Sequence, residues 1–189
     1  MGLVEGFAEL KHRISVLDYH RMGETGVLAP DARVELIEGE IFDMAPIGKT
    51  HASIVDRLTR MFVLAAGERA IVRVQDPVRM GEHSEPEPDV TLLRPRADYY
   101  SEIAPAAADV YLIVEVSDST QRYDRRVKVP LYARHGVPEV WVIDLENGLV
   151  HFHRGPAGDG YADISASEGP GVTPVAALPG VAIDLAGLL

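Results

Sequence analysis

The sequence predicts one α/β domain in which helices flank a mixed β-sheet. Apolar residues recur at helical spacing over residues 51–67, whereas β-prone apolar runs occupy residues 89–93, 109–116 and 139–145. A chain of 189 residues is long enough to bury a sizeable core, and no repeat or low-complexity linker divides it. We therefore expect residues 1–189 to form a single domain of α/β or α+β type.

Two helices are expected in the N-terminal third of the chain. Ser15 and Asp18 have the spacing of a capping box, which predicts a short helix that ends near Gly23. Thr50 is placed to cap a second helix, which runs to about Gly67 and turns one apolar face towards the core.

Strands are expected on either side of the second helix. Residues 34–44 predict two strands that turn at Glu38-Gly39, which gives an N-terminal β-hairpin. Residues 71–78 alternate in polarity as a further strand, and residues 89–93 predict another strand after a polar loop.

The C-terminal half is expected to contain a strand, a basic helical segment over residues 120–135 and two more strands. Pro130 is expected to kink or interrupt the helical segment. Residues 139–145 and 149–154 are joined by an Asn-Gly pair, which is typical of a tight hairpin turn. The tail after residue 154 is predicted to hold a glycine-rich loop and an irregular stretch.

Composition limits the classes of function. The absence of cysteine excludes disulfides and thiolate metal sites, so any metal must be bound by oxygen or imidazole. The longest apolar runs are too short to cross a bilayer and no export signal is visible, so we expect a cytoplasmic protein without a membrane partner. The net charge of −11 argues against general nucleic-acid binding. Residues 117–135 are the exception, because this stretch contains five Arg or Lys and only two Asp, which gives it a net positive charge.

Two carboxylates stand beside apolar strands in a way that predicts a metal site. Period-two alternation places Tyr111, Ile113 and Glu115 on one face of the strand, where a lone buried carboxylate is costly. A bound divalent cation or a salt bridge to Arg or Lys offsets that cost. Asp89 opens its strand after Pro88, and two such strands side by side bring Asp89 close to Glu115. Mg²⁺ prefers such oxygen ligands, and it activates water for attack on a phosphate.

Lys128 supplies a cation shortly after Glu115. It lies four residues after Asp124, so the pair shares one helix face and is either an ordinary solvated ion pair or part of the site. A lysine beside a metal stabilises negative charge on a phosphate in the transition state or orients the attacking water.

Several other polar residues have two readings. Glu35 or Glu38 is either an additional acid in the cavity of Asp89 or an exposed hairpin charge, and Gln75 is a further lining candidate. His51, at a helix N-terminus, is expected to be neutral. The remaining expectations place Trp141 in the core, Asp144 as a cap of the following turn, and His151 with His153 as solvated imidazoles on an edge strand rather than as a metal-binding pair.

The order of these motifs resembles the Uma-type restriction endonuclease family of the PD-(D/E)XK nuclease superfamily. The matching stretches are VELIEGEIFDMAPIGKTHASIVDRL (34–58), VQDPVRM (74–80), EPEPDVTLL (85–93), YLIVEVSDST (111–120), YDRRVKVPLYARHGVPEVWVID (123–144) and PGVAIDL (179–185).

This resemblance implies a restriction-endonuclease-like fold and divalent-metal chemistry on DNA, with Mg²⁺ or Mn²⁺ as cofactor. Asp89 matches the PD aspartate and Glu115 the second acid, so both are expected to bind metal. The usual lysine position holds Ser117, and in Uma-type sequences the lysine stands on the following helix, here Lys128. The resemblance also places His51 near the metal, in contact with water or phosphate.

Three functions remain open at this point. The first is a DNA endonuclease in which Asp89 and Glu115 hold the metal and Lys128 assists; it is expected to be a homodimer, with residues 140–143 and 149–154 as candidate interface. The second is a catalytically inactive nuclease fold that serves as a binding or assembly module, which the net charge favours. The third is an acidic domain whose carboxylates pair with arginines, namely Arg122, Arg125 or Arg126.

Overall fold

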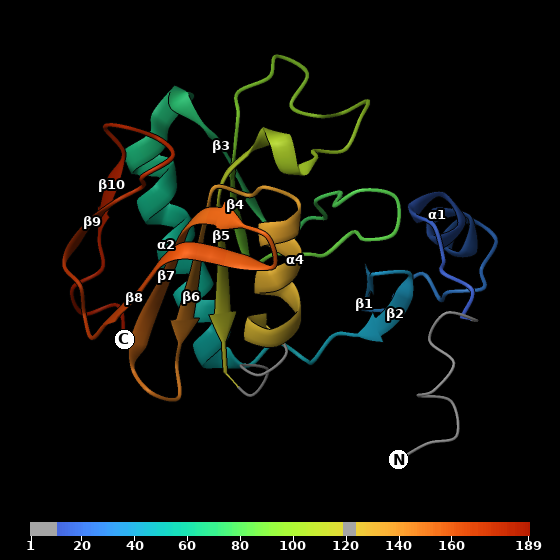
Figure 1. Cartoon of the computed structure of the whole chain (residues 1–189), viewed down its shortest axis with the longest axis horizontal. Helices are drawn as coiled ribbons and strands as arrows, with labels where there is room; N and C mark the ends of the chain where they lie inside the picture. Colours follow the sequence, from blue (N-terminus) through green and yellow to red (C-terminus); the bar gives the residue numbers. More distant parts are fainter. Residues whose placement is uncertain (1–10, 119–123) are drawn as a thin grey trace.

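The computed structural model describes residues 11–118 and 124–189 (Figure 1). The elements in chain order are α1 (Val16–Glu24), β1 (Val34–Ile37), β2 (Glu40–Asp43), α2 (Lys49–Ala66), the 3₁₀ turn η2 (Gly67–Arg69), β3 (Ile71–Val74), β4 (Val90–Leu93), the 3₁₀ turn η3 (Ala107–Asp109), β5 (Val110–Ser117), the π-helix η4 (Asp124–Lys128), α4 (Val129–Arg134), β6 (Glu139–Asp144), β7 (Leu149–Ala157), β8 (Gly160–Ser167), β9 (Val172–Pro174) and β10 (Ala182–Asp184).

A six-stranded sheet in the order β3-β4-β5-β6-β7-β8 forms the centre of the fold. All neighbouring strands are antiparallel except β5 and β6, which run parallel and are connected through η4 and α4. A parallel pair needs such a crossover connection, whereas the antiparallel pairs need only turns. The predicted mixed sheet flanked by helices is confirmed.

The two faces of the sheet are covered by different helices. On one face α2 contributes Leu58 and Phe62 to a core cluster that also contains Trp141 of β6. The expected burial of Trp141 is confirmed, since its side chain is fully buried. On the other face α4 packs Leu131 and Tyr132 against the residues of β5 and β6 that point that way. The sheet is therefore the middle layer between α2 and α4 (Figure 1).

The N-terminal helix and hairpin lie beside this layered body, at the right of Figure 1. Ser15 accepts a hydrogen bond from the backbone N–H of Asp18 at 3.1 Å, so the predicted N-cap of α1 is confirmed. The predicted hairpin is confirmed as well, with Ile37 paired to Glu40 across the turn. A bridge between Leu36 and the loop before β4 fixes the hairpin to the body.

Two predicted boundaries in the middle of the chain are wrong. The helix α2 begins one residue before Thr50, and its N-cap is Gly48, which has no side chain to cap the helix. The strand predicted over 71–78 ends at Val74, because Gln75 adopts a left-handed backbone with φ of 52°. Gln75 then donates its backbone N–H to the carbonyls at the start of β4. The early turn directs the Gln75 side chain towards β4.

The segment after β5 differs from a single kinked helix. It forms the π-helix η4 followed by α4, and Pro130 stands in the first turn of α4. At that position proline removes an N–H that would have no intrahelical partner, so it does not break the helix. Residues 119–123, with Arg122, lie outside the described residues, as do the side chains of Asp124 and Arg125.

The side chains of β5 were expected to alternate between the two faces of the sheet, with Tyr111, Ile113 and Glu115 on one face, and this alternation holds only in part. The register between β4 and β5 shifts at Leu92, so that Leu93 pairs with Val110 and Tyr111 is left without a partner opposite. Tyr111 therefore packs with the α2 cluster, although Ile113 faces α4. The shift lies at the start of β5, so Glu115 keeps its expected face.

The C-terminal third contains strands that were not predicted. The stretch expected to be irregular forms β8, which pairs with β7, and β9, which forms a separate hairpin with β10 in the closing segment 178–185. Because β7 lies between β6 and β8, His151 and His153 are only 9% and 7% exposed, and the prediction of solvated imidazoles on an edge strand is wrong.

Most of the expected dimer surface is buried by the same packing, and only Leu149 and Arg154 at its ends are half-buried. Residues 140–143 of β6 have no exposed side-chain surface, and residues 150–153 of β7 are buried between its neighbours. Asp144 caps the following turn as expected, since it accepts a hydrogen bond from the backbone N–H of Asn147 at 2.9 Å. Among the described residues, no helix has the length and hydrophobicity needed to cross a bilayer.

Candidate active site

A cavity of about 120 Å³ opens where the carboxyl end of β5 meets the N-terminal hairpin, the start of α2 and the end of η4. Among the residues that the structure describes, its charged lining consists of six carboxylates and two cations. These are Glu35, Asp43, Glu87, Asp89, Glu115 and Asp118 on the acidic side, and Arg33 and Lys128 on the basic side. These described residues carry a formal excess of four negative charges.

Asp89 and Glu115 reach this cavity from neighbouring strands. Because β4 and β5 are antiparallel with Val90 opposite Val114, the start of β4 and the end of β5 lie at the same end of the sheet. Asp89 precedes β4 directly, and Glu115 directly follows Val114, the last residue of β5 in the ladder with β4. The expected adjacency of the two strands is confirmed.

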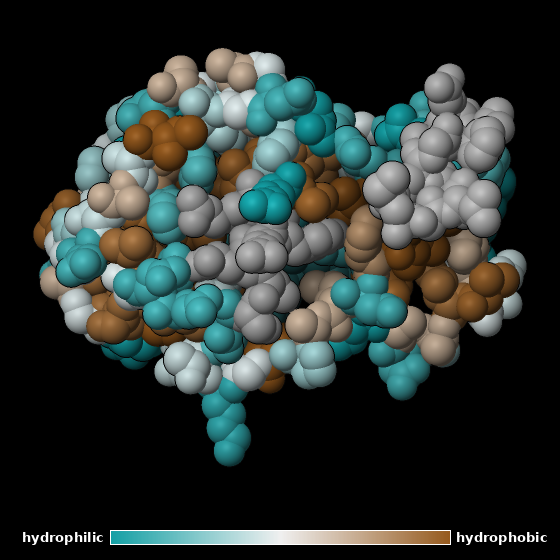
Figure 2. Space-filling view, turned by 60° about the horizontal axis from the view of Figure 1, so that its bottom comes forward, coloured by the Kyte–Doolittle hydropathy of each residue, from teal (hydrophilic) through white to brown (hydrophobic). Residues whose placement is uncertain are grey.

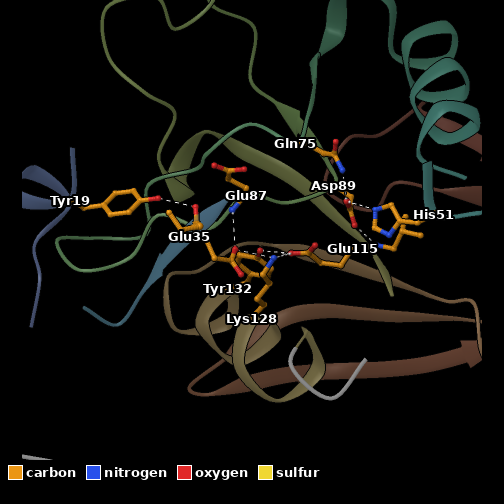
Figure 3. A network of polar contacts seen from close by, with 11 residues as sticks. Tyr19, Glu35, His51, Gln75, Glu87, Asp89, Glu115, Lys128 and Tyr132 are labelled. Atoms are coloured by element: carbon orange, nitrogen blue, oxygen red, sulfur yellow. Dashed lines mark hydrogen bonds and ion pairs between the residues drawn. The ribbon is translucent and has the colours of Figure 1, made fainter. Parts of the chain in front are cut away.

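Three donors hold the Asp89 carboxylate (Figure 3). Its Oδ2 accepts the backbone N–H of Val116 at 2.8 Å, while Oδ1 lies 2.8 Å from His51 Nε2 and 3.2 Å from Gln75 Nε2. His51 comes from the first turn of α2, and Gln75 from the turn after β3. A carboxylate has roughly four acceptor positions, so Asp89 is oriented without being saturated.

Lys128 lies between two buried carboxylates. Its Nζ is 3.1 Å from Glu35 Oε2 and 3.4 Å from Glu115 Oε1. All three side chains are at least 94% buried, and desolvated charges are stable only when they are paired. Although η4 is a π-helix rather than an α-helix, the Lys128 side chain reaches the cavity lining.

Tyr132 is a site residue that the sequence analysis missed. Its hydroxyl donates a hydrogen bond to Glu115 Oε1 at 2.5 Å, and the side chain is fully buried. Tyr132 follows Lys128 by four residues, which places both on one side of the helical segment. That spacing was the available signal, but tyrosine on an apolar helix face is equally typical of a core.

Glu87 is a second residue that the sequence analysis did not select. Its backbone N–H donates to Glu35 Oε2 at 3.3 Å, and its own carboxylate lines the cavity. Partial burial and then the nearby Glu35 carboxylate raise the pKa of Glu87 above its ordinary value, while Arg33 and Lys128 act in the opposite direction. The same acidic surroundings act on Tyr19 of α1: burial and then three carboxylates raise its pKa to about 12.

The two glutamates of the hairpin have different places. Glu35 lines the cavity, whereas Glu38 stands at the hairpin turn, outside the lining, with 54% of its side chain exposed. Glu38 pairs with Arg134 of α4, with 2.5 Å between Oε1 and Nη2. The other predicted site residues, namely His51, Gln75, Asp89, Glu115 and Lys128, all line the one cavity.

The donor set is suited to a hard divalent cation. Among residues 11–118 and 124–189, no three His, Asp or Glu side chains form a ready metal-binding cluster. Mg²⁺ does not need such a cluster, because one or two carboxylates suffice when water and a substrate phosphate complete its shell. Asp89 and Glu115, set in a lining with an excess of negative charge, meet that requirement.

Comparison with known proteins identifies relatives of the fold. Residues 16–186 match the sequence model of a family described as “Uma2: Putative restriction endonuclease”. The structure resembles a solved one described as “a putative nuclease belonging to DUF820 from Anabaena variabilis ATCC 29413”, with a TM-score of 0.64 and 18% sequence identity over 82% of this chain and 88% of that chain. At this identity the likeness concerns the fold alone. No curated protein matches the sequence.

Proposed function

We propose that this chain, which belongs to the Uma2 family, is a metal-dependent nuclease that hydrolyses phosphodiester bonds of DNA. The family description supports the nuclease class. The observation that carries the proposal is the convergence of Asp89 and Glu115, from adjacent strands, on a cavity that also holds Lys128. Mg²⁺ or Mn²⁺ is the proposed cofactor.

Asp89 and Glu115 are the residues assigned to hold the cation in this proposal. A bound divalent cation supplies Lewis-acid polarisation of the phosphate and a lowered pKa of the attacking water. His51, Gln75 and the backbone N–H of Val116 fix the orientation of the Asp89 carboxylate through their hydrogen bonds. We therefore assign His51 and Gln75 to positioning Asp89.

Lys128 is assigned to stabilise negative charge on the phosphate in the transition state. A buried ammonium acts strongly on such charge because little solvent screens it. Glu35 keeps the ammonium paired and in place, since it contacts Lys128 from the side opposite Glu115 (Figure 3). Glu38 has no role in this assignment, because it lies outside the cavity.

The proposal extends to assembly and location. We expect a homodimer, because two symmetric sites can cut both strands of a duplex, and we place the protein in the cytoplasm with its DNA substrate. Its interface must use a surface other than residues 140–143, which are buried in the sheet.

Nicking of supercoiled plasmid in Mg²⁺ and in Mn²⁺ tests the function. The wild type is expected to nick DNA in a metal-dependent way, whereas Asp89→Asn and Glu115→Gln are expected to lose at least about a hundredfold in rate. Asp163→Asn on the exposed edge strand β8 is the matched control, because it makes the same charge change away from the cavity.

A catalytically inactive nuclease fold used for binding is the competing function, and the net charge of −11 with an acidic cavity favours it. Isothermal titration calorimetry with Mn²⁺, together with the nicking assay, distinguishes the nuclease from the inactive binding protein. Wild-type protein that neither nicks DNA nor binds Mn²⁺ would contradict the nuclease proposal. Nicking that survives in both site variants would contradict the assignment of the site.

A further inference from the structure

Arg33 is an exposed cation at the mouth of the candidate active site. It stands one residue before β1, and its carbonyl accepts the backbone N–H of Met44 at 2.9 Å, which extends the hairpin by one pair. Its side chain is exposed and belongs to the cavity lining. The backbone at Arg33 is therefore fixed by the hairpin while its guanidinium faces solvent.

The Arg33 guanidinium is oriented by a single hydrogen bond. Its Nη1 donates to the carbonyl of Ala45 at 3.1 Å, and in the described part of the chain it makes no ion pair and no other side-chain hydrogen bond. A guanidinium has five N–H donors in a planar fork, so most of them remain available to a ligand. The bond to Ala45 therefore restrains one nitrogen of the guanidinium and leaves the other donors available.

The two cations of the lining differ in burial and in ion pairing. Lys128 is buried and held between Glu35 and Glu115. Arg33 is exposed and forms no ion pair with the six described carboxylates of the lining, although its charge acts on the pKa of Glu87 from beyond ion-pair distance. An anionic phosphate that approaches this cavity meets an excess of four negative charges. Among the described residues of the lining, Arg33 is the exposed cation, and its guanidinium fork matches two phosphate oxygens.

An apolar ledge continues from Arg33 along the same wall. Met44, Ala45, Pro46 and Ile47 line the cavity, and Ile47 remains 41% exposed. Figure 2 shows that hydrophobic residues gather at several places on this face of the molecule, among hydrophilic ones. A cation beside a short apolar ledge suits a nucleotide, whose phosphate is charged and whose sugar and base present weakly polar faces.

We propose that Arg33 binds a backbone phosphate of the nucleic acid next to the scissile one, with residues 44–47 against the adjoining sugar or base. This inference rests on the proposed nuclease function, because it names how the same site positions its substrate. Arg33 contacts substrate in this assignment but takes no part in bond cleavage.

Binding of a fluorescently labelled DNA duplex, followed by anisotropy in Ca²⁺ over a series of KCl concentrations, tests the role of Arg33. Arg33→Gln is expected to raise Kd about tenfold and to lower the slope of log Kd against log[KCl] by about 1, the value for one lost phosphate contact. Arg33→Lys keeps the charge and is expected to keep the slope while losing part of the affinity.

Arg60→Gln is the matched control, because Arg60 is an exposed arginine of α2 that does not line the cavity. Its slope and Kd are expected to equal those of the wild type. If Arg33 merely fastens the ledge through Ala45, Arg33→Gln will leave the slope unchanged whatever it does to affinity, and this result would overturn the inference. Wild-type protein that binds no DNA would contradict the nuclease function itself, which separates the two failures.

Discussion

Lys128 and Glu35 form a buried ion pair, with 3.1 Å between Nζ and Oε2, although one residue belongs to the crossover segment after β5 and the other to the N-terminal hairpin. The pair connects the N-terminal hairpin of β1 and β2, which lies beside the sheet, to the segment that follows β5. It also holds the ammonium next to Glu115, at 3.4 Å. One contact thus serves both the fold and the candidate site.

Removing the Lys128 charge is expected to destabilise the protein strongly. Lys128→Met leaves Glu35 and Glu115 buried and facing each other, so we expect the free energy of unfolding to fall by about 3–5 kcal/mol. Lys11→Met is the matched control, because Lys11 pairs with Glu40 at 2.9 Å on the exposed surface, where such a pair contributes about 0–1 kcal/mol.

Urea denaturation measures both variants. The double variant of Lys128→Met with Glu35→Gln is expected to be less destabilised than the sum of its parts, with a coupling of roughly 0.5–3 kcal/mol. Strict additivity would show that the ion pair contributes no coupling to stability.

The Tyr132 hydroxyl is expected to stabilise the Glu115 carboxylate. Tyr132→Phe removes a donor at 2.5 Å from a buried charged acceptor, so we expect a loss of about 1.5–3 kcal/mol in unfolding free energy. Tyr161→Phe is the comparison, because the Tyr161 hydroxyl donates to a neutral carbonyl, that of Val137, at 3.0 Å. Thermal unfolding of the two variants measures the difference, and an equal loss in both would contradict a special role for Tyr132.

Asp144 is expected to give the fold a pH-dependent contribution. Burial raises the pKa of this carboxyl, but hydrogen bonds from Asn147 and then His151 outweigh it and hold the pKa below the ordinary 3.8. A depressed pKa means stability that is present above pH 3.8 and is lost as the pH falls through the folded value.

Asn147→Ala is therefore expected to reduce the unfolding free energy by about 1 kcal/mol at neutral pH and to differ less from the wild type below pH 3.8. Chemical denaturation at a series of pH values from about 3 to 7, roughly the range over which carboxyl groups titrate, measures the unfolding free energy of both proteins as a function of pH. Glu146→Ala, an exposed change in the same turn, is expected to give a curve parallel to that of the wild type.

Gly39 is expected to tolerate no side chain. A Cβ at Gly39 would lie 2.6 Å from Arg13 Cβ, and φ there is +83°. Gly26 has a similar φ of +76° but open space around it, so Gly26→Ala carries only the backbone strain of about 1–2 kcal/mol. We expect Gly39→Ala to lower the melting temperature clearly more than Gly26→Ala, and equal melting temperatures would show that the hairpin can shift to make room.

Local patterns accounted for much of the fold. The hairpin at Glu38-Gly39, the cap at Ser15 and the cap at Asp144 depend on neighbouring residues only, and all three are confirmed. The end of β3 was missed, because Gln75 turns away to bond with the start of β4, a partner distant in sequence. The burial of His151 was missed because it depends on β8, a strand whose polar sequence gives little sign of pairing.

By itself the sequence determined which chemical groups the candidate site contains, since carboxylates, a lysine and a histidine at the ends of predicted elements can be recognised from spacing and polarity. Only the tertiary structure decided how they combine. It selected Glu35 over Glu38, brought Tyr132 onto Glu115, and placed Arg33 at the cavity mouth. The physical reason is that each of these contacts joins elements far apart in the chain, so packing of the hairpin and α4 against the sheet sets their distances.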